Sequence, residues 1–312
     1  MSGASGTATT IVFGEALVDD FATEQIVGGA PFNVARHLAA FMAPQLMITR
    51  VGEDRNGATI QAEFERFAMS QAGLQRDAIE ETGRVIVERG PKGHRFVIVP
   101  NQAYDYIARE EALAAAKTVD AGAFYFGTLA QRGERSRGTL KALLSATQGT
   151  RFLDVNMRDG QVDERTISDS LHAADIAKVN EDELQALFGW YFQLGPNDAP
   201  MAADETRSAC GALLQMFGLQ ALIVTLGHRG SVYFGADGVT IDTRDTPAPP
   251  FVIDTVGAGD AFSAIFLLGH ARGWPLDVTL ARANEFAGAI CAIPGAVPRD
   301  LGFYDKWMNS WR

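Results

Sequence analysis

The sequence predicts an α/β fold in which a mainly parallel sheet is covered by helices on both faces. Beyond about residue 110, short and nearly uninterrupted apolar strands alternate with helical segments, which is typical of parallel strands joined by helices. The composition, 47% apolar and 21% charged residues, supplies ample core for a globular chain of 312 residues. The expected strands of this sheet are residues 11–13, 47–51, 124–126, 152–155, 176–179 and 222–224, and the expected helices are 31–41, 110–117, 136–147, 206–217, 261–268 and 280–292.

A β-hairpin interrupts this alternation and predicts a second, smaller sheet. Residues 84–89 and 94–99 form two apolar-rich segments separated by the turn Gly90-Pro91-Lys92-Gly93. Apolar side chains stand on both faces of this hairpin, so its second face needs a cover. The same sheet of a second copy is the simplest cover, and we therefore expect a homodimer.

Other features of the sequence indicate how many domains the chain forms, which partners it lacks and in which compartment it works. Residues 1–10 are rich in Ser, Gly, Ala and Thr and lack the regions of a signal peptide, so we expect a flexible tail before one domain at 11–312. No apolar run approaches the roughly 18 residues of a membrane span. The net charge of −11 argues against nucleic acid and anionic membranes as partners. Cys210 and Cys291 form no C-x-x-C pair, which fits a reducing cytoplasm.

The clearest chemical signal is the stretch 254–260, with the sequence DTVGAGD. The amides of Gly257, Ala258 and Gly259 are expected at a helix N-terminus, where free N–H groups and the helix dipole favour an anion such as a phosphoryl group. Asp260 would repel that anion. The conflict makes sense if its carboxylate takes a proton from a nucleophile that attacks phosphorus. The alternative interpretation is a helix cap with an acidic first turn.

A second glycine turn, Gly28-Gly29-Ala30-Pro31, leads into the first long helix. Pro31 suits a first helical turn, and the paired glycines let a ligand approach the backbone. Asn33 offers both a donor and an acceptor to a polyol. A plain turn with a helix cap is the alternative here.

Polar or glycine residues follow the carboxyl end of each apolar strand, which is the edge where open α/β sheets bind ligands. These residues are Gly14 and Asp19, Gly52 and Asp54, Thr128, Asn156 and Arg158, Asn180 and Glu183, and Thr225 and Gly227. For any single strand the alternative is an ordinary polar loop. Together they predict a ligand cleft along this edge.

These motifs resemble the two signatures of the ribokinase/PfkB family of carbohydrate kinases, over residues 11–298. D-T-V-G-A-G-D-A-F is the commonest form of the C-terminal signature, and G-E-A-L-V-D followed by G-G-A-P is similar to the fructokinase branch. Ile265 and Met42 depart from it, because small residues usually stand there, and at Ile265 we expect only a packing change. The resemblance implies a ribokinase-like three-layer α/β/α domain whose small sheet, about residues 17–28 and 84–107, forms a lid.

The resemblance also implies individual roles. Asp260 is the catalytic base, and Gly257, Ala258 and Gly259 form the anion hole. The implied sugar-binding residues are Asp19, Gly28, Gly29, Asn33, Arg95 and Arg158. The implied nucleotide-binding residues are Asn180, Thr225, Gly227, Gly230, Thr255, Gly257, Gly259 and Asn284. Glu183 is implied to bind Mg²⁺ through water. For Asn180 and Glu183 a helix N-terminal cap is an alternative. The role of Arg158 stays open between clamping phosphate oxygens and holding the lid.

The implied reaction transfers the γ-phosphoryl group of ATP to a primary hydroxyl of a monosaccharide, with fructose the leading substrate. Mg²⁺ is the implied cofactor, whereas a monovalent cation such as K⁺, held by main-chain carbonyls, leaves no side-chain signature. The alternatives are a kinase for 2-keto-3-deoxygluconate, ribose or a nucleoside, and a non-catalytic sugar-binding regulator. The chain has no P-loop, and residues 14–17 do not supply the G-x-G-x-x-G of a dinucleotide-binding dehydrogenase.

Overall fold

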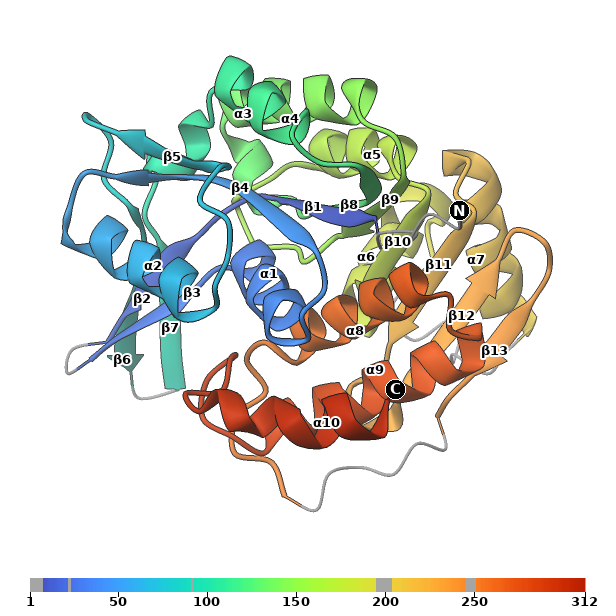
Figure 1. Cartoon of the computed structure of the whole chain (residues 1–312). Helices are drawn as coiled ribbons and strands as arrows, with labels where there is room; N and C mark the ends of the chain where they lie inside the picture. The colour runs from blue at the N-terminus through green and yellow to red at the C-terminus, as the bar shows by residue number, and fades with distance from the viewer. Residues whose placement is uncertain (1–7, 22–23, 91–92, 195–203, 245–250, 312) are drawn as a thin grey trace, which may run out of the picture.

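The computed structural model describes residues 8–21, 24–90, 93–194, 204–244 and 251–311, with side chains except at 87–96 and 204 (Figure 1). Within these ranges nine strands form one sheet in the order β13-β12-β11-β10-β9-β8-β1-β4-β5. Its strands are β1 (Thr9–Phe13), β4 (Gln45–Gly52), β5 (Leu74–Asp77), β8 (Ala121–Phe126), β9 (Thr150–Asp154), β10 (Ile176–Asn180), β11 (Ala221–Thr225), β12 (Ser231–Gly235) and β13 (Thr240–Asp242). Pairing is parallel from β5 to β11 and antiparallel from β11 to β13. The predicted mainly parallel sheet is confirmed.

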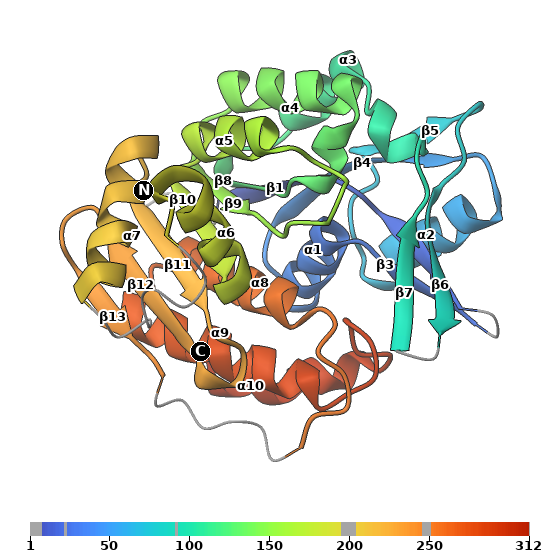
Figure 2. The same cartoon turned by 180° about the vertical axis from the view of Figure 1, so that it is seen from behind.

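Helices cover both faces of this sheet, as Figures 1 and 2 show. Successive side chains of a strand point to opposite faces, so in β1 Ile11 and Phe13 enter one apolar core and Val12 enters the other. The helices that cover the first core are α3 (Arg109–Ala116), α4 (Glu134–Ala146), α5 (Glu164–Ala173), α6 (Glu181–Phe192) and α7 (Asp204–Phe217). The helices that cover the second core are α1 (Ala30–Ala40), α2 (Arg55–Arg66), α8 (Ala258–Arg272), α9 (Leu276–Cys291) and α10 (Asp305–Ser310). In the described part of the chain, no helix has the length and apolar character needed to cross a membrane.

A small sheet projects from one end of the molecule (Figure 1, left). Its strands are β2 (Leu17–Asp20), β3 (Gln25–Gly28), β6 (Gly83–Gly90) and β7 (Gly93–Ile98), in the order β3-β2-β6-β7. The β6–β7 pair is antiparallel, so the predicted hairpin is confirmed. Beyond β7 the short 3₁₀ helix η1 (Ala103–Tyr106) is not part of this sheet and packs on α4 and β4.

The strand order reverses beside β1, and this reversal positions the ligand site. From β1 the chain moves to β4 and β5 on one side, and then returns to β8 on the other side. The connections after β1 and β8 therefore leave in opposite directions. In open α/β sheets the crevice at the carboxyl ends of two such strands is where ligands bind.

The end of the chain packs against α1 and holds a loop near that crevice. His37 of α1 is fully buried, and burial lowers its pKa to about 3, so the ring is neutral. Its Nε2 donates to the carbonyl oxygen of Ala296 (3.1 Å), and its Nδ1 accepts from the hydroxyl of Tyr304 (2.9 Å) in the 3₁₀ helix η4 (Leu301–Tyr304). Tyr304 belongs to an aromatic cluster with Phe41 and Phe286, which makes this anchor rigid.

Candidate active site

A cleft of about 830 Å³ lies at the carboxyl edge of the large sheet, under the small sheet and beside the first turn of α8. The structure brings the predicted site residues together in its lining. These are Asp19, Gly28, Gly29, Asn33, Arg158, Asn180, Glu183, Thr225, Gly227, Gly230, Thr255, Gly257, Ala258, Gly259, Asp260 and Asn284. The side chain of Arg95, also predicted, lies outside the described residues.

Four of the positions predicted at strand ends lie outside the lining, namely Gly14, Gly52, Asp54 and Thr128. Asp54 instead caps α2, where it accepts from the amide of Gly57 (2.8 Å), and it also accepts from the amide of Thr82 (2.7 Å). Gly52, just before it, donates its amide to the Thr82 hydroxyl (2.9 Å). Thr128 donates its hydroxyl to the carbonyl oxygen of Val155 (2.7 Å). For Gly52, Asp54 and Thr128 the structure thus agrees with the alternative of an ordinary polar loop, because these groups form hydrogen bonds to other parts of the protein outside the cleft.

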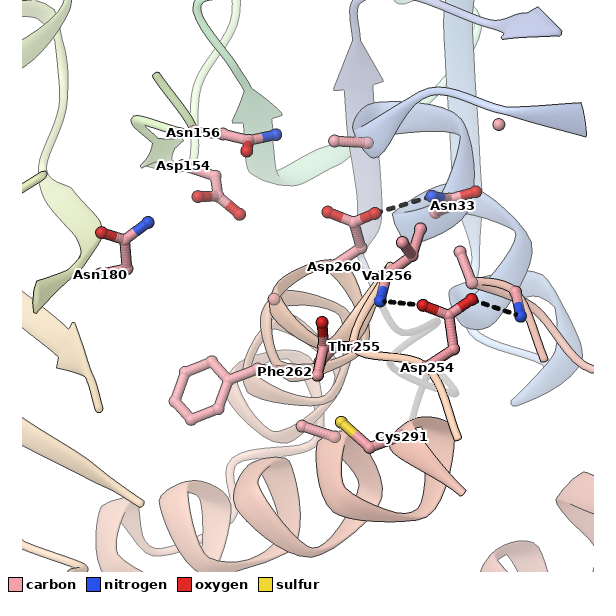
Figure 3. A pocket seen from close by; sticks show the side chains of 18 of the residues that line it. Asn33, Asp154, Asn156, Asn180, Asp254, Thr255, Val256, Asp260, Phe262 and Cys291 are labelled. Carbon is pink, nitrogen blue, oxygen red and sulfur yellow. Dashed lines mark hydrogen bonds between the residues drawn. The ribbon is translucent and has the colours of Figure 1, made fainter. Parts of the chain in front are cut away.

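The glycine-rich turn leads into α8 and is held in place by close packing at Gly257 and by hydrogen bonds to Asp254 (Figure 3). Gly257 has φ +77°, and a Cβ on it would lie 2.3 Å from the Cβ of Ala296, so only glycine fits. Asp254 accepts from the amides of Val256 and Gly295, both at 3.0 Å, which ties the turn to the C-terminal loop. The first amides of a helix have no acceptor within it, so the turn presents donors and a positive dipole end to the cleft.

Asp260 lies in the first turn of α8 and is 8% exposed. Its Oδ2 accepts from Nδ2 of Asn33 at 2.7 Å, and Figure 3 shows the two side chains pointing toward each other. Burial raises the pKa of Asp260 to about 6; the hydrogen bond from Asn33 opposes this, the Asp154 charge adds to it, and Lys178 and Arg158 lower it. Asp260 is therefore mostly ionised at neutral pH, yet basic enough to take a proton.

A buried ion pair, not anticipated from the sequence, lines the floor of the cleft. Nζ of Lys178 donates to Oδ2 of Asp154 at 2.7 Å, and Ser263 Oγ donates to the same oxygen at 3.0 Å. A Cβ placed on Gly259 would lie 3.2 Å from Nζ, so this ammonium group borders the glycine-rich turn. The available signal was a lysine inside the apolar strand 176–179, because a buried lysine almost always has a partner.

Glu15 is a second lining residue that sequence reasoning missed. It lies two residues after the end of β1, is 4% exposed, and burial raises its pKa to about 7. In the described part of the chain its Oε2 has no hydrogen-bond partner. Nearby Asp19 also has its pKa raised, to about 6, by burial. The signal that could have found Glu15 was an acidic residue two positions after the first strand.

Asn180 and Glu183 form the helix cap that was the alternative interpretation. The Asn180 side chain accepts from the amide of Glu183, and Oε2 of Glu183 accepts from the amide of Asn180, both at 2.8 Å. Oε1 of Glu183 accepts from the amide of Met157 at 2.7 Å. The described residues contain no cluster of three His, Cys, Asp or Glu side chains arranged for a metal. Both residues still line the cleft, so contact with a hydrated ion through water fits this geometry.

The other end of the cleft is lined by residues of α9. Asn284, Ala287, Gly288 and Cys291 line it, and their spacing places them on one face of the helix. Asn284 Nδ2 donates to the Thr243 hydroxyl (2.7 Å) and the Ser231 hydroxyl (3.2 Å), so its amide is held in place. Gly227, which begins the 3₁₀ helix η3 (Gly227–Arg229), lines the same end together with Thr225 and Gly230.

A family model for pfkB family carbohydrate kinases matches residues 5–299. The chain belongs to the pfkB family of carbohydrate kinases. A fructokinase from Klebsiella pneumoniae is a similar pfkB relative, 29% identical over 322 residues, and the match covers 96% of this chain and 98% of the relative. The predicted family and the predicted carbohydrate kinase activity are thus confirmed.

Solved pfkB structures share the ribokinase-like fold with this chain. A fructokinase from Xylella fastidiosa with bound ATP superposes with a TM-score of 0.76 at 20% identity, covering 92% of this chain and 93% of that one. A fructokinase double mutant from Vibrio cholerae O395, with fructose, ADP and potassium ion bound, superposes with a TM-score of 0.75 at 22% identity, covering 94% and 95%. At these identities the likeness establishes the fold, and the predicted ribokinase-like architecture is confirmed.

Proposed function

We propose that this pfkB kinase transfers the γ-phosphoryl group of ATP to a primary hydroxyl of fructose. The observation that carries the proposal is the contact between Asn33 and Asp260 (2.7 Å). It holds a buried carboxylate between a polar end of the cleft and a glycine-rich anion turn, so a hydroxyl and a phosphate meet beside a proton acceptor. A carboxylate so placed serves as general base for the attacking hydroxyl.

The sugar occupies the end of the cleft below the small sheet. Asp19, Asn33 and Arg158 supply charged or amide groups for its hydroxyls, and the backbone of Gly28 and Gly29 lines the entrance to α1. Arg95, whose backbone belongs to β7 of the small sheet, is retained as a sugar-binding residue on the family resemblance alone. The remaining lid wall is apolar and consists of Leu17, Phe21, Ile26, Val85 and Ile98. Specificity for hydroxyl groups therefore comes mainly from the floor of this end.

ATP occupies the other end, with its base against α9 and its phosphates at the turn 257–259. In the transfer, Asp260 takes the proton of the sugar hydroxyl as its oxygen attacks the γ-phosphorus. The bond from the γ-phosphorus to the β,γ-bridging oxygen breaks and ADP leaves, while the turn amides and Lys178 offset the negative charge on the phosphate oxygens. ATP enters as its Mg²⁺ complex, which Glu183 and Asn180 would contact through water. K⁺ belongs in the assay because the Vibrio cholerae structure was solved with a potassium ion bound.

The substrate is tested with a panel of fructose, ribose, adenosine and 2-keto-3-deoxygluconate, with MgATP and K⁺, read as ADP release. Fructose is expected to give the highest kcat/KM, because a site that hydrogen-bonds several hydroxyls rejects analogues that leave its polar groups unpaired. A higher kcat/KM for another compound would replace fructose and leave the kinase assignment standing. No turnover of any compound would favour a non-catalytic sugar-binding regulator.

The proposal includes a homodimer that forms through the small sheet. Val85 and Ile98 face the cleft, whereas Ile86, 37% exposed, and its register partner Val97 lie on the opposite face. An exposed apolar face on a narrow sheet is best covered by the same face of a second copy.

We also propose a cytoplasmic location, which suits the free thiols of Cys210 and Cys291.

A further inference from the structure

We propose that Arg36 is a positioning residue for the catalytic base, and that it acts by fixing which end of the Asn33 amide faces Asp260. The inference rests on the proposed function of Asp260. Nη2 of Arg36 donates to Oδ1 of Asn33 at 2.6 Å, and Nδ2 of Asn33 donates to Oδ2 of Asp260 at 2.7 Å. The three side chains form one buried chain of hydrogen bonds, with exposures of 3%, 4% and 8%.

The chemistry of the amide makes this chain directional. A side-chain amide carries an acceptor at one end and a donor at the other, whereas a guanidinium group only donates and a carboxylate only accepts. Arg36 on one side and Asp260 on the other are therefore both satisfied in one amide orientation. In the reverse orientation, the Asn33 NH₂ would meet the guanidinium group and its oxygen would meet the carboxylate. Without Arg36, one of these two mismatches disappears, so the orientation in which Asn33 donates to Asp260 is held less firmly.

Arg36 is itself held rigidly. It follows Asn33 by one turn of α1, which puts both side chains on the same face of the helix. Nη1 donates to Oε2 of Glu63 at 2.8 Å, Nη2 also donates to the carbonyl oxygen of Val27 at 3.0 Å, and the guanidinium group lies 4.8 Å from the ring centroid of Phe32. A planar, always-charged fork can serve these acceptors together, which a lysine cannot do.

The orientation of the Asn33 amide affects the pKa of Asp260. The hydrogen bond from Asn33 lowers the pKa of Asp260 and so counters burial. The other groups that act on or are coupled to Asp260 are Glu15 after β1, Tyr125 on β8, Asp154 and Arg158 at the end of β9, and Lys178 on β10. Their places do not depend on Arg36, since none of them is among its hydrogen-bond partners in the described residues.

The first experiment measures the pH dependence of kcat/KM for Arg36→Met, a variant of similar length without charge. Glu63 keeps a partner in it, because Arg66 donates to both carboxylate oxygens (2.8 and 2.9 Å), so the fold should survive. The acid limb of the profile is expected to move to higher pH by about one unit, since a hydrogen bond to a charged group has roughly that effect. Arg36→Lys keeps the charge beside Glu63 and should shift the limb less.

The second experiment asks whether Arg36 works through Asn33. Asn33→Ala should shift the limb in the same direction, and Arg36→Met added to Asn33→Ala should shift it no further. A loss of activity in Arg36→Met that is equal at all pH values would overturn the proposal, because a merely structural residue changes the active fraction and leaves the pKa alone. An additional shift in the double variant would overturn it as well.

A measurement without turnover separates this inference from the proposed function. The pKa of Asp260 is followed by the ¹³C shift of its carboxyl group, assigned with Asp260→Asn. A higher pKa in Arg36→Met supports the inference even if no sugar in the panel is phosphorylated. An unchanged pKa refutes it even if the enzyme proves to be a fructokinase. If Arg36→Met does not fold, the same titration on Arg36→Lys decides the question.

Discussion

Nζ of Lys178 lies 2.7 Å from Oδ2 of Asp154, with the two side chains 6% and 2% exposed. The residues are register partners on the adjacent parallel strands β10 and β9. Both point to the cleft at the carboxyl edge of the sheet, where Ser263 Oγ and the Tyr125 hydroxyl also donate to Asp154, at 3.0 and 3.3 Å. The pair thus fixes a positive charge next to the glycine-rich turn without leaving a charge unpaired.

Lys178→Met should destabilise the fold and weaken catalysis. It leaves the buried Asp154 carboxylate without its counter-charge, and such a loss costs about 3 kcal/mol of unfolding free energy. Urea unfolding gives this value, and initial rates at varied ATP give the effect on kcat and the KM for ATP. Asp154→Asn combined with Lys178→Met removes both charges and should restore most of the stability. An unfolding free energy for Lys178→Met within about 0.5 kcal/mol of wild type would contradict this account of the pair.

Asp260→Asn should reduce kcat by about 10²- to 10⁴-fold, with a much smaller change in the sugar KM, because the amide cannot accept the proton. The fold should persist. Since burial raises the pKa of Asp260, its ionised form is disfavoured in the native state, and the variant should be at least as stable as wild type at pH 8. Asp277→Asn, exposed in the first turn of α9, is the matched control. More than a tenth of the wild-type kcat in Asp260→Asn would exclude Asp260 as the base.

Glu15→Gln should make the protein more stable at pH 8 and change little at pH 5. The pKa of Glu15 is raised from 4.5 to about 7, so the folded chain holds a proton there that the unfolded chain releases at lower pH. Wild-type stability therefore falls as the pH rises from about 4.5 to 7, and the variant lacks this fall. The difference at pH 8 is on the order of 3 kcal/mol. Urea unfolding at both pH values checks it, with the exposed Glu65→Gln as control; equal pH slopes for wild type and Glu15→Gln would refute it.

Ile86→Asp should convert the proposed dimer to a monomer, because it places a charge in the centre of the outward apolar face of the small sheet. Light scattering at micromolar concentrations measures the mass. Ile86→Val keeps the face apolar and should remain dimeric. A monomeric wild-type mass would rule out this assembly.

The glycine-rich turn and its aspartate were predictable because their chemistry is local. In residues 257–260, Gly257 has a positive φ that favours glycine, Ala258 begins a helix, and Asp260 is the acidic residue of its first turn. All three features depend on adjacent residues of the sequence. The strands were predictable for a similar reason, since burial on both faces makes each of them a short apolar run. The hairpin 84–99 was likewise predictable, because the turn residues 90–93 separate its two apolar strands.

Lys178, Glu15 and Arg36 were not predicted as site residues because their roles depend on partners distant in the sequence. Lys178 meets Asp154 across two strands, and Arg36 meets Glu63 from another helix. The antiparallel strands β12 and β13 were missed as well. β13 has three residues and is largely exposed, so an apolar run does not mark it. Asn180 and Glu183 show the opposite case, where one local pattern fits both a cap and a ligand site.

The contact between Gly257 and Ala296 has a consequence for when activity arises during synthesis. The turn is held by a loop that His37 and Tyr304 fix in place, so its final shape requires residues more than 250 positions apart in the chain. A nascent chain that has released β1 and α1 from the ribosome still lacks the far wall of its anion turn. The anion turn therefore takes its final shape only after residues 296–304 have been synthesised, and we expect phosphoryl transfer to begin no earlier.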